Sequence, residues 1–485
     1  MSRADIRALA LTLLLLCTSK AGADVPIEYH SGSLLHALEW QSGAQEKSWA
    51  VRSPNGGGYS YIVPNIGGSW RRYGPGTPTA TSNAMESLNL PLLATHPLTG
   101  NFIPMLADRW YSDSTSGITY FHIDDDASWS DGVPVTSHDI AFTLNFLSDP
   151  AHQTEFQRRQ INQDVQAVII FDPSHFAIVH RQEHIPESIH SLRPLPAHFF
   201  DSERPWPSGH DLEPSPVTGP YRPDELNYNA VSFRRIQNWW GDKQAFLKHR
   251  FHATDINLHR STDDAFRAFA NGEIDSISSD NRHVLSSPWA KHLTKQYKIK
   301  QVSCSGCPAT ASGVIFSPSV TRQQRQSLMT ALENRTAHFI VPDFDLFYPY
   351  TQAFEWLRPW AGAYAEPSDM LLRRLNEGRY DAIIISAEMT RDTPEASLKR
   401  AISGIDSFGD IAALPDFTYH QYLVWEWVEL PEQPLVSAAG LLNPFDAVYG
   451  GLFSVNRKAR AEMLDKPERR ESDTPPAVIN YPKKN

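Results

Sequence analysis

The residues whose spacing most suggests chemistry are two cysteines, Cys304 and Cys307, separated by two positions. In an oxidising compartment such a pair forms a local disulfide, which is our first expectation. A redox-active pair would need a helix that starts at the first thiol, because the helix N-terminus lowers the thiol pKa. The residues that follow, 308–313 (PATASG), are poor helix formers. A zinc site would need two more Cys or His ligands close by, and none stand there.

Familiar catalytic motifs are absent from the sequence. It contains no H-E-x-x-H, G-x-S-x-G, Walker or G-x-G-x-x-G pattern. The nearest metal-like cluster is Glu183, His184, Glu187 and His190, but Pro186 would interrupt the single helix face that such a site needs. We therefore expect a protein that is not an enzyme and that carries no metal or cofactor. A secreted enzyme with an unfamiliar catalytic constellation stays open as an alternative.

The first residues, Met1 to Ala23, are typical of a secretory signal. Two arginines precede an apolar run at residues 8–17, and Ala21-Gly22-Ala23 offers a cleavage site. The apolar run is too short to span a bilayer, which takes about 20 residues. We expect a mature chain that starts near Asp24 and is secreted to the periplasm.

Lipid anchoring is the alternative to a cleaved, soluble product. It would use Cys17, but Leu16 stands before that cysteine where a small residue is expected. The formal net charge is −11, which makes nucleic acid an improbable partner because phosphate binding needs a basic face.

The pattern of apolar residues predicts a mixed α/β chain. Strands are expected at residues 59–63, 118–123, 165–171 and 176–179, with a helix between the second and third. Thr136 begins that helix with a capping box completed by Asp139.

Two later segments share one pattern of helix, glycine, two residues, aspartate and strand. The first contains Gly272 and Asp275, and the second contains Gly378 and Asp381. Such joints are the αβ half of an α/β unit, with glycine at the helix C-terminus. The charged segment 466–485, which has few large apolar residues, is expected to be a disordered tail.

The run LADRWYSDSTSGITYFHIDDDASWSDGVPVTSHDIAFTLNFL resembles the signature of family 5 extracellular solute-binding proteins, the oligopeptide and dipeptide receptors of ABC importers. The positions that match are Leu106, Ala107, Trp110, Asp131, Gly132, Pro134, Thr136, Asp139 and Ile140. Three further elements follow in the family's order: residues 218–221 (TGPY), 238–241 (NWWG) and 269–275 (FANGEID).

Weaker similarity points to the branch that binds oligopeptides and microcin C-like peptides. Residues 54–58 (PNGGG) are similar to the glycine-rich start of that branch, and residues 347–350 (FYPY) to a later element. The chain departs from the branch at residues 69–73 (SWRRY), where a D-S-L-N-P-type segment is usual, and at Ser317, where Asn is common. Both departures fall where a ligand is expected, so they bear on the ligand more than on the fold.

The resemblance implies a type II periplasmic binding protein, with two α/β lobes joined by a hinge and a small extra domain. We expect the following division: 1–23 signal peptide; 24–75 and 180–280 lobe I; 76–179 extra domain; 281–425 lobe II; 426–465 return to lobe I; 466–485 tail. The implied function is capture of oligopeptides or peptide-like solutes for import. The expected partners are that ligand and an inner-membrane ABC permease, and the protein is expected to be a monomer.

Aromatic and charged residues in loops that should face the cleft are the candidate ligand contacts. Core packing is an equal alternative for each of them. The candidates are Trp70, Arg71, Met85, Glu86, Trp129, Trp356, Trp360 and Tyr364. Within the receptor class, a non-peptide ligand such as an oligosaccharide, a nickel chelate or haem stays open.

Overall fold

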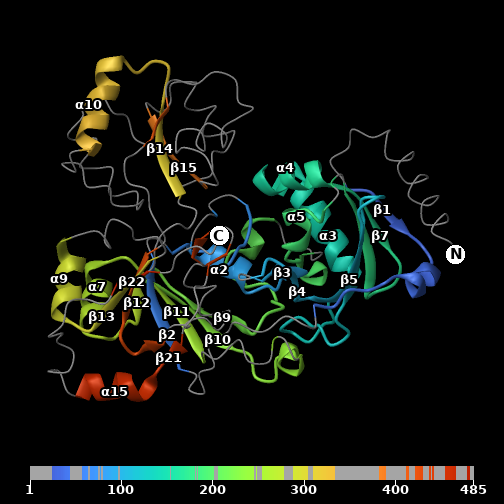
Figure 1. The fold of residues 1–485 in the computed structure, drawn as a ribbon, viewed down its shortest axis with the longest axis horizontal. Helices are drawn as coiled ribbons and strands as arrows, with labels where there is room; N and C mark the ends of the chain where they lie inside the picture. Colours follow the sequence, from blue (N-terminus) through green and yellow to red (C-terminus); the bar gives the residue numbers. More distant parts are fainter. Residues whose placement is uncertain are drawn as a thin grey trace. The chain divides into compact units, whose positions relative to one another are not determined.

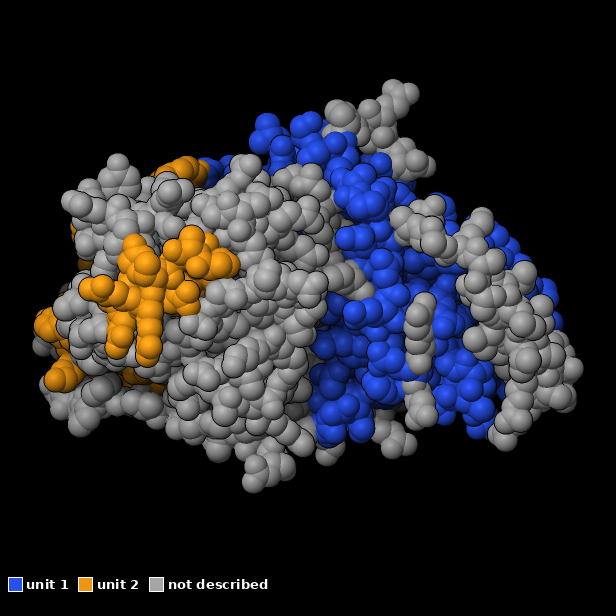
Figure 2. Space-filling view, turned by 90° about the horizontal axis from the view of Figure 1, so that it is seen from above, with its two compact units in different colours: residues 1–48, 67–227, 232–251 blue, residues 49–66, 228–231, 252–485 orange. Residues whose placement is uncertain are grey.

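The computed structural model places the chain in two compact units, coloured separately in Figure 2. Unit 1 comprises Met1–Ser48, Gly67–Asn227 and Ser232–Phe251, and unit 2 comprises Trp49–Ile66, Tyr228–Val231 and His252–Asn485. The structure describes residues 25–43, 57–63, 66–74, 77, 80–96, 99–152, 155–180, 182, 184–200, 206–244, 247, 254–277, 288–303, 310–333, 382–388, 411–413, 421–429, 436–437, 440–441, 454–465 and 478–480.

The main sheet of unit 1 has the strand order β1-β7-β8-β6-β5. Its strands are β1 (Ile27–Tyr29), β5 (Ala107–Asp113), β6 (Ile118–Ile123), β7 (Val165–Ile170) and β8 (His175–His180). The β1–β7 pair is parallel and the other pairs are antiparallel. Every residue of β6 is buried, as suits a strand with a neighbour on each side.

Helices α3 (Ser137–Ser148) and α4 (Glu155–Asp164) contact β7 of this sheet (Figure 1). The remaining elements of unit 1 are short. They are η2 (Gly32–Ala37), α2 (Ala80–Ser87), β3 (Leu93–Thr95), β4 (Phe102–Pro104), η3 (Pro150–His152), α5 (Glu187–His190), α6 (Ala197–Phe200), η4 (Ser208–His210), β9 (Tyr221–Leu226), β10 (Ala230–Arg235) and η5 (Trp240–Lys243). The residues of β10 are divided between the two units, since Ala230 and Val231 are assigned to unit 2.

A buried carboxylate holds the start of α3 and fastens α6 to it. Asp139 Oδ2 accepts a hydrogen bond from the Thr136 backbone N–H at 2.8 Å, and Oδ1 accepts one from the Ala197 N–H at 2.9 Å. The Thr143 hydroxyl accepts a bond from the Leu195 N–H at 2.8 Å. The capping pattern expected at Thr136 is therefore confirmed, and the same residues position the aromatic side chains of α6.

Within unit 2, the strands of the larger sheet are ordered β22-β13-β17-β12-β2-β11, and a second sheet has the order β15-β14-β16. Strand β2 runs parallel to both β11 and β12. The elements of this unit are β2 (Tyr59–Val63), β11 (Asp255–Arg260), α7 (Asp263–Ala270), β12 (Ser276–Ile277), α9 (Pro288–Gln296), β13 (Ile299–Ser303), β14 (Thr310–Phe316), α10 (Arg322–Glu333), β15 (Ala382–Glu388), β16 (Ile411–Ala413), β17 (Gln421–Trp425), β18 (Val428–Glu429), β19 (Val436–Ser437), β20 (Gly440–Leu441), β21 (Ser454–Val455), α15 (Arg457–Asp465) and β22 (Val478–Asn480).

The joint between α7 and β12 follows the pattern expected from the sequence. Gly272 ends the helix with a φ of +82°, a left-handed conformation that favours glycine. Asp275 then has no exposed surface, and its carboxylate accepts bonds from the Ser60 N–H and the Trp427 Nε1–H, both at 2.9 Å. Arg460 of α15 lies 3.4 Å from the same carboxylate. The joint thus ties β2, β12 and the helix α15 together.

The α/β class expected from the sequence is confirmed, and the expected strands appear at residues 59–63, 118–123, 165–170 and 175–180. The strand after Asp381 is β15, while the helix expected before it lies outside the described residues. The expected lobe boundaries, signal and tail stay predictions. Among the helices that the structure describes, none is both long enough and apolar enough to cross a membrane.

Candidate functional site

A small hollow in unit 1 brings together two segments that lie far apart in the sequence. The space that its side chains enclose is tight, enough for about one water-sized group. Its lining residues are Trp70, Arg71, Arg72, Tyr73, Phe199, Phe200, Trp206, His210, Glu213 and Ser215. A backbone bond from the Trp70 N–H to the Asp211 carbonyl, at 2.9 Å, joins the two segments.

Arg72 forms the rigid base of this hollow. Its side chain is 1% exposed, and its guanidinium donates to Glu86 Oε2, to the Pro194 and Arg193 carbonyls and to the Tyr73 hydroxyl. Burial disfavours the charge, but the facing Glu86 carboxylate outweighs that effect and the pKa of Arg72 is raised. Burial raises the pKa of the Tyr73 phenol, whose hydroxyl donates to Glu86 at 2.7 Å.

Arg71 is held differently, because only one side of its guanidinium is engaged. Its Nε donates to Asp211 Oδ1 at 2.5 Å and to the Ser69 hydroxyl at 3.2 Å. Its side chain is 11% exposed, and its Nη1 atom is buried without a hydrogen-bond partner among the described residues. The arginine therefore presents a fixed donor to the hollow.

Aromatic rings form the opposite wall. Trp206 meets Phe146 edge to face, with centroids 5.0 Å apart, and lies 5.5 Å from the His210 ring. His210 stacks on Phe200 at 5.0 Å. The Trp206 Nε1 atom is buried and, within the part of the chain that the structure describes, has no hydrogen-bond partner. This wall offers apolar surface and one further N–H donor.

Gly74 lies close to both donor-bearing side chains. Its φ is +102°, which disfavours residues with a side chain. A Cβ atom there would lie 3.0 Å from Trp206 Cζ2 and 3.2 Å from Arg71 Nη1. The glycine therefore allows the backbone to approach both groups closely.

The metal-like cluster noted in the sequence does not form one helix face. Helix α5 begins at Glu187, directly after Pro186, and Glu183 lies outside the described residues. Burial lowers the pKa of His190 to about 4. No group of three or more His, Cys, Asp or Glu side chains arranged to hold a metal ion occurs among the described residues.

The predicted ligand contacts fall into three sets. Trp70 and Arg71 line the hollow, and Glu86 holds its base through Arg72. Met85 has no exposed surface and Trp129 is 2% exposed. Both therefore pack in the core, which was the alternative interpretation of each candidate. The ligand candidates Trp356, Trp360 and Tyr364 lie outside the described residues, and so does the predicted disulfide pair, Cys304 and Cys307. Their roles stay predictions, as do the ligand contacts of the first set.

Sequence reasoning missed Tyr73 and the whole aromatic wall. The signal was present as the density of rings in residues 196–210 (PAHFFDSERPWPSGH), which lie seven residues before the TGPY element. That element itself is structural, because the indole N–H groups of Trp239 and Trp240 both donate to the Thr218 carbonyl at 2.8 Å.

Comparison with known proteins gives one family and a consistent set of relatives. Residues 101–305 match the family description "Bacterial extracellular solute-binding proteins, family 5 Middle". A probable peptide-binding protein YejA of Agrobacterium fabrum is 24% identical over 179 residues, which are 34% of this chain and 28% of that protein. The periplasmic oligopeptide-binding protein OppA of Haemophilus influenzae is 25% identical over 242 residues, 45% of this chain and 43% of that protein.

The aligned stretches thus span less than half the length of these relatives. Among solved structures, Listeria monocytogenes OppA bound to peptide superposes with a TM-score of 0.56 at 10% identity. The superposition covers 84% of this chain and all of that one. This likeness shows the fold, that of type II periplasmic binding proteins.

Proposed function

We propose that this chain, whose residues 101–305 match the family 5 extracellular solute-binding proteins, is a member of that family and captures peptides or peptide-like solutes for an ABC importer. The observation that carries the proposal is the family match. The matched residues also include the aromatic wall of the hollow. The names of the relatives from Agrobacterium and Haemophilus point to the same class of ligand.

The hollow supports binding rather than chemistry. It combines fixed N–H donors with flat apolar rings, and peptides supply carbonyl acceptors next to apolar side chains. Receptors that hold the backbone through such bonds accept many side chains, since water fills the remaining space.

The other parts of the proposal follow from export. The segment Met1–Ala23 directs the chain to the periplasm and is cleaved, and the mature protein acts there as a monomer. An inner-membrane permease receives the ligand, and no catalytic step changes it. Membership of the oligopeptide and microcin C branch is part of the proposal.

The test is a thermal-shift screen of the purified protein against pools of peptides of about two to ten residues. A ligand that binds the folded state stabilises it by about 2.7 kcal/mol at a hundredfold excess over Kd. For a chain of this size each kcal/mol raises Tm by about 2 °C, so we expect a shift of about 5 °C.

Chromatography of the peptides before and after incubation is the companion measurement, and intact peptide is expected. Peptide cleavage in proportion to protein concentration would replace the receptor with an enzyme. Stabilisation by haem, nickel chelates or oligosaccharides, with none by peptides, would refute the peptide assignment and leave a receptor for another solute.

A further inference from the structure

Two buried N–H donors that have no hydrogen-bond partner among the described residues belong to side chains that line the same small hollow. They are Arg71 Nη1 and Trp206 Nε1. A buried donor that makes no bond costs about 1–3 kcal/mol, so such groups are few in folded proteins and two in one hollow are uncommon. A group that accepts hydrogen bonds would recover this cost on entering the hollow.

The geometry keeps both donors in place and close to each other. Arg71 cannot turn freely because Asp211 and Ser69 bind its Nε. Trp206 is fixed by edge-to-face contact with Phe146 and with His152, whose ring centroids lie 5.0 and 5.6 Å away. Gly74 lies against both side chains, beside Arg71 Nη1 and Trp206 Cζ2, an atom two bonds from Nε1.

The charges around the hollow favour a neutral acceptor over an anion. Arg71 is paired with Asp211 and Arg72 is paired with Glu86. Because each guanidinium group already faces a carboxylate, neither offers an unpaired positive charge to an anionic ligand, whereas an amide oxygen needs only the N–H donors.

We propose that this hollow is a subsite for the carbonyl oxygen of a neutral amide, which accepts hydrogen bonds from Arg71 Nη1 and Trp206 Nε1. The tight space has room for the carbonyl oxygen, and the rings of Trp206 and Phe200 line it. The proposal rests on the receptor function for the identity of the natural ligand, a peptide backbone or a carboxamide side chain.

A small probe tests the subsite independently of peptide binding. The indole N–H signals of the ¹⁵N-labelled protein are recorded by TROSY NMR, and the Trp206 signal is assigned by its loss in Trp206→Phe. Trp40→Phe serves as the control, because the Trp40 indole already donates to the Leu35 carbonyl at 3.2 Å. Acetamide is then titrated against sodium acetate at equal ionic strength.

Acetamide is expected to shift the Trp206 signal and leave the Trp40 signal in place. Arg71→Lys keeps a cation for Asp211 but removes Nη1, and it is expected to weaken the acetamide response about tenfold, the loss of one charge-assisted hydrogen bond. Arg234→Lys is the matched control, since Arg234 is 60% exposed and pairs with Asp224. In Arg234→Lys, acetamide should shift the Trp206 signal as much as it does in the wild type.

Three results would overturn the subsite. The Trp206 signal could stay unmoved by acetamide, respond equally in Arg71→Lys, or respond more strongly to acetate than to acetamide. A protein that binds acetamide as described but no peptide would retain the subsite and refute the receptor function. A protein that binds peptides but whose Trp206 signal does not shift with acetamide would retain the receptor function and refute the subsite.

Discussion

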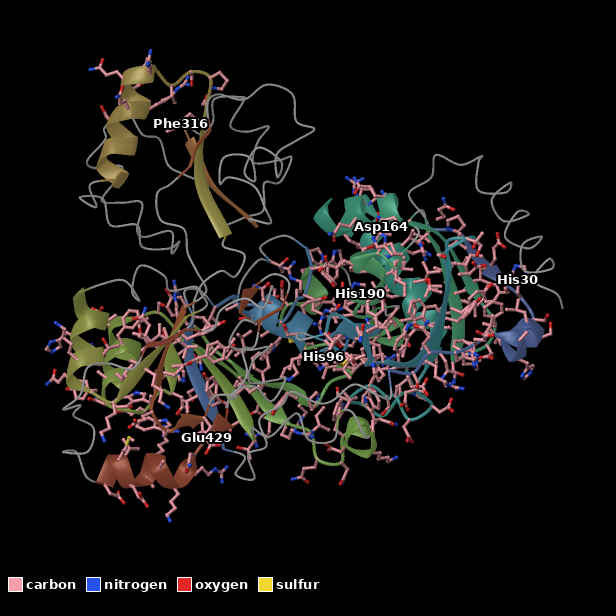
Figure 3. The ribbon with its side chains drawn as sticks, viewed as in Figure 1. His30, His96, Asp164, His190, Phe316 and Glu429 are labelled. Atoms are coloured by element: carbon pink, nitrogen blue, oxygen red, sulfur yellow. The ribbon has the colours of Figure 1, made fainter. Side chains whose placement is uncertain are left out.

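The two units bury ionisable groups of opposite kinds. Unit 1 encloses His190, labelled in Figure 3, and His180. Burial lowers the pKa of both histidines, that of His190 to about 4. Unit 2 encloses the carboxylate of Asp275, whose pKa burial raises to about 6 even though Arg460 lies beside it. Burial favours the neutral form of each of these groups, so acid should change their contributions to stability in opposite directions.

The sign of each contribution follows from which state binds the proton more tightly. The unfolded chain takes up a proton at His190 near pH 6.5, whereas the folded chain does so only near pH 4, so unit 1 loses stability as pH falls through this window. Folded Asp275 binds its proton near pH 6 and the unfolded residue near pH 3.8, so unit 2 loses stability as pH rises through that window. Burial raises the pKa of Asp124 in unit 1 and lowers the pKa of His259 in unit 2, so each opposes the trend of its unit. The contribution of one group is therefore measured with a variant of that group alone.

The largest effect is expected from Arg72→Met in unit 1. The change leaves Glu86 and two backbone carbonyls without their donor, and breaking a buried ion pair costs about 3–5 kcal/mol. Because the Glu86 side chain is 35% exposed, we expect the lower end of that range. Hydrogen exchange should show faster opening of β6 and β8 and unchanged protection of β2 and β12.

Arg234→Met, at an exposed arginine of the same unit, is the control and should change protection by less than about 0.5 kcal/mol. Equal loss of protection in both units after Arg72→Met would show that the buried arginine does not act on unit 1 alone.

A smaller effect is expected from Asp275→Asn in unit 2. Deprotonation of Asp275 should cost unit 2 about 2 kcal/mol of stability as pH rises from 4 to 7, and the neutral amide should remove this contribution. Hydrogen exchange of β2 and β12, corrected for the intrinsic effect of pH on exchange, measures it. If the variant keeps the wild-type slope, another group is responsible.

An effect of comparable size to that of Asp275 is expected from His190→Phe in unit 1. The ring contact with Phe102, at 4.9 Å, is kept while the titrating nitrogen is removed. Unit 1 of this variant should lose less stability than the wild type between pH 6.5 and pH 4. The exposed His36 provides the control variant His36→Gln, which should behave as the wild type. NMR titration of His190 with a midpoint near 6.5 would contradict the account.

Local features of the fold were predictable from the sequence, and the composition of the hollow was not. The strand at residues 118–123 has the predicted bounds, and Asp139 caps its helix, because alternation and capping depend on neighbours in the chain. Trp70 and Trp206 lie 136 positions apart and meet only in the folded unit. Sequence alone could not separate Trp70 from Trp129, since both are aromatic and only packing decides which one lines a hollow.

The central claim, that the chain is a peptide receptor, is tested most directly by identifying what the protein carries from its native compartment. Mass spectrometry of gently unfolded protein purified from the periplasm should release intact peptides, and the same peptides should rebind and raise Tm. Release of a non-peptide solute that rebinds, or of peptides that the protein itself cleaves, would contradict it.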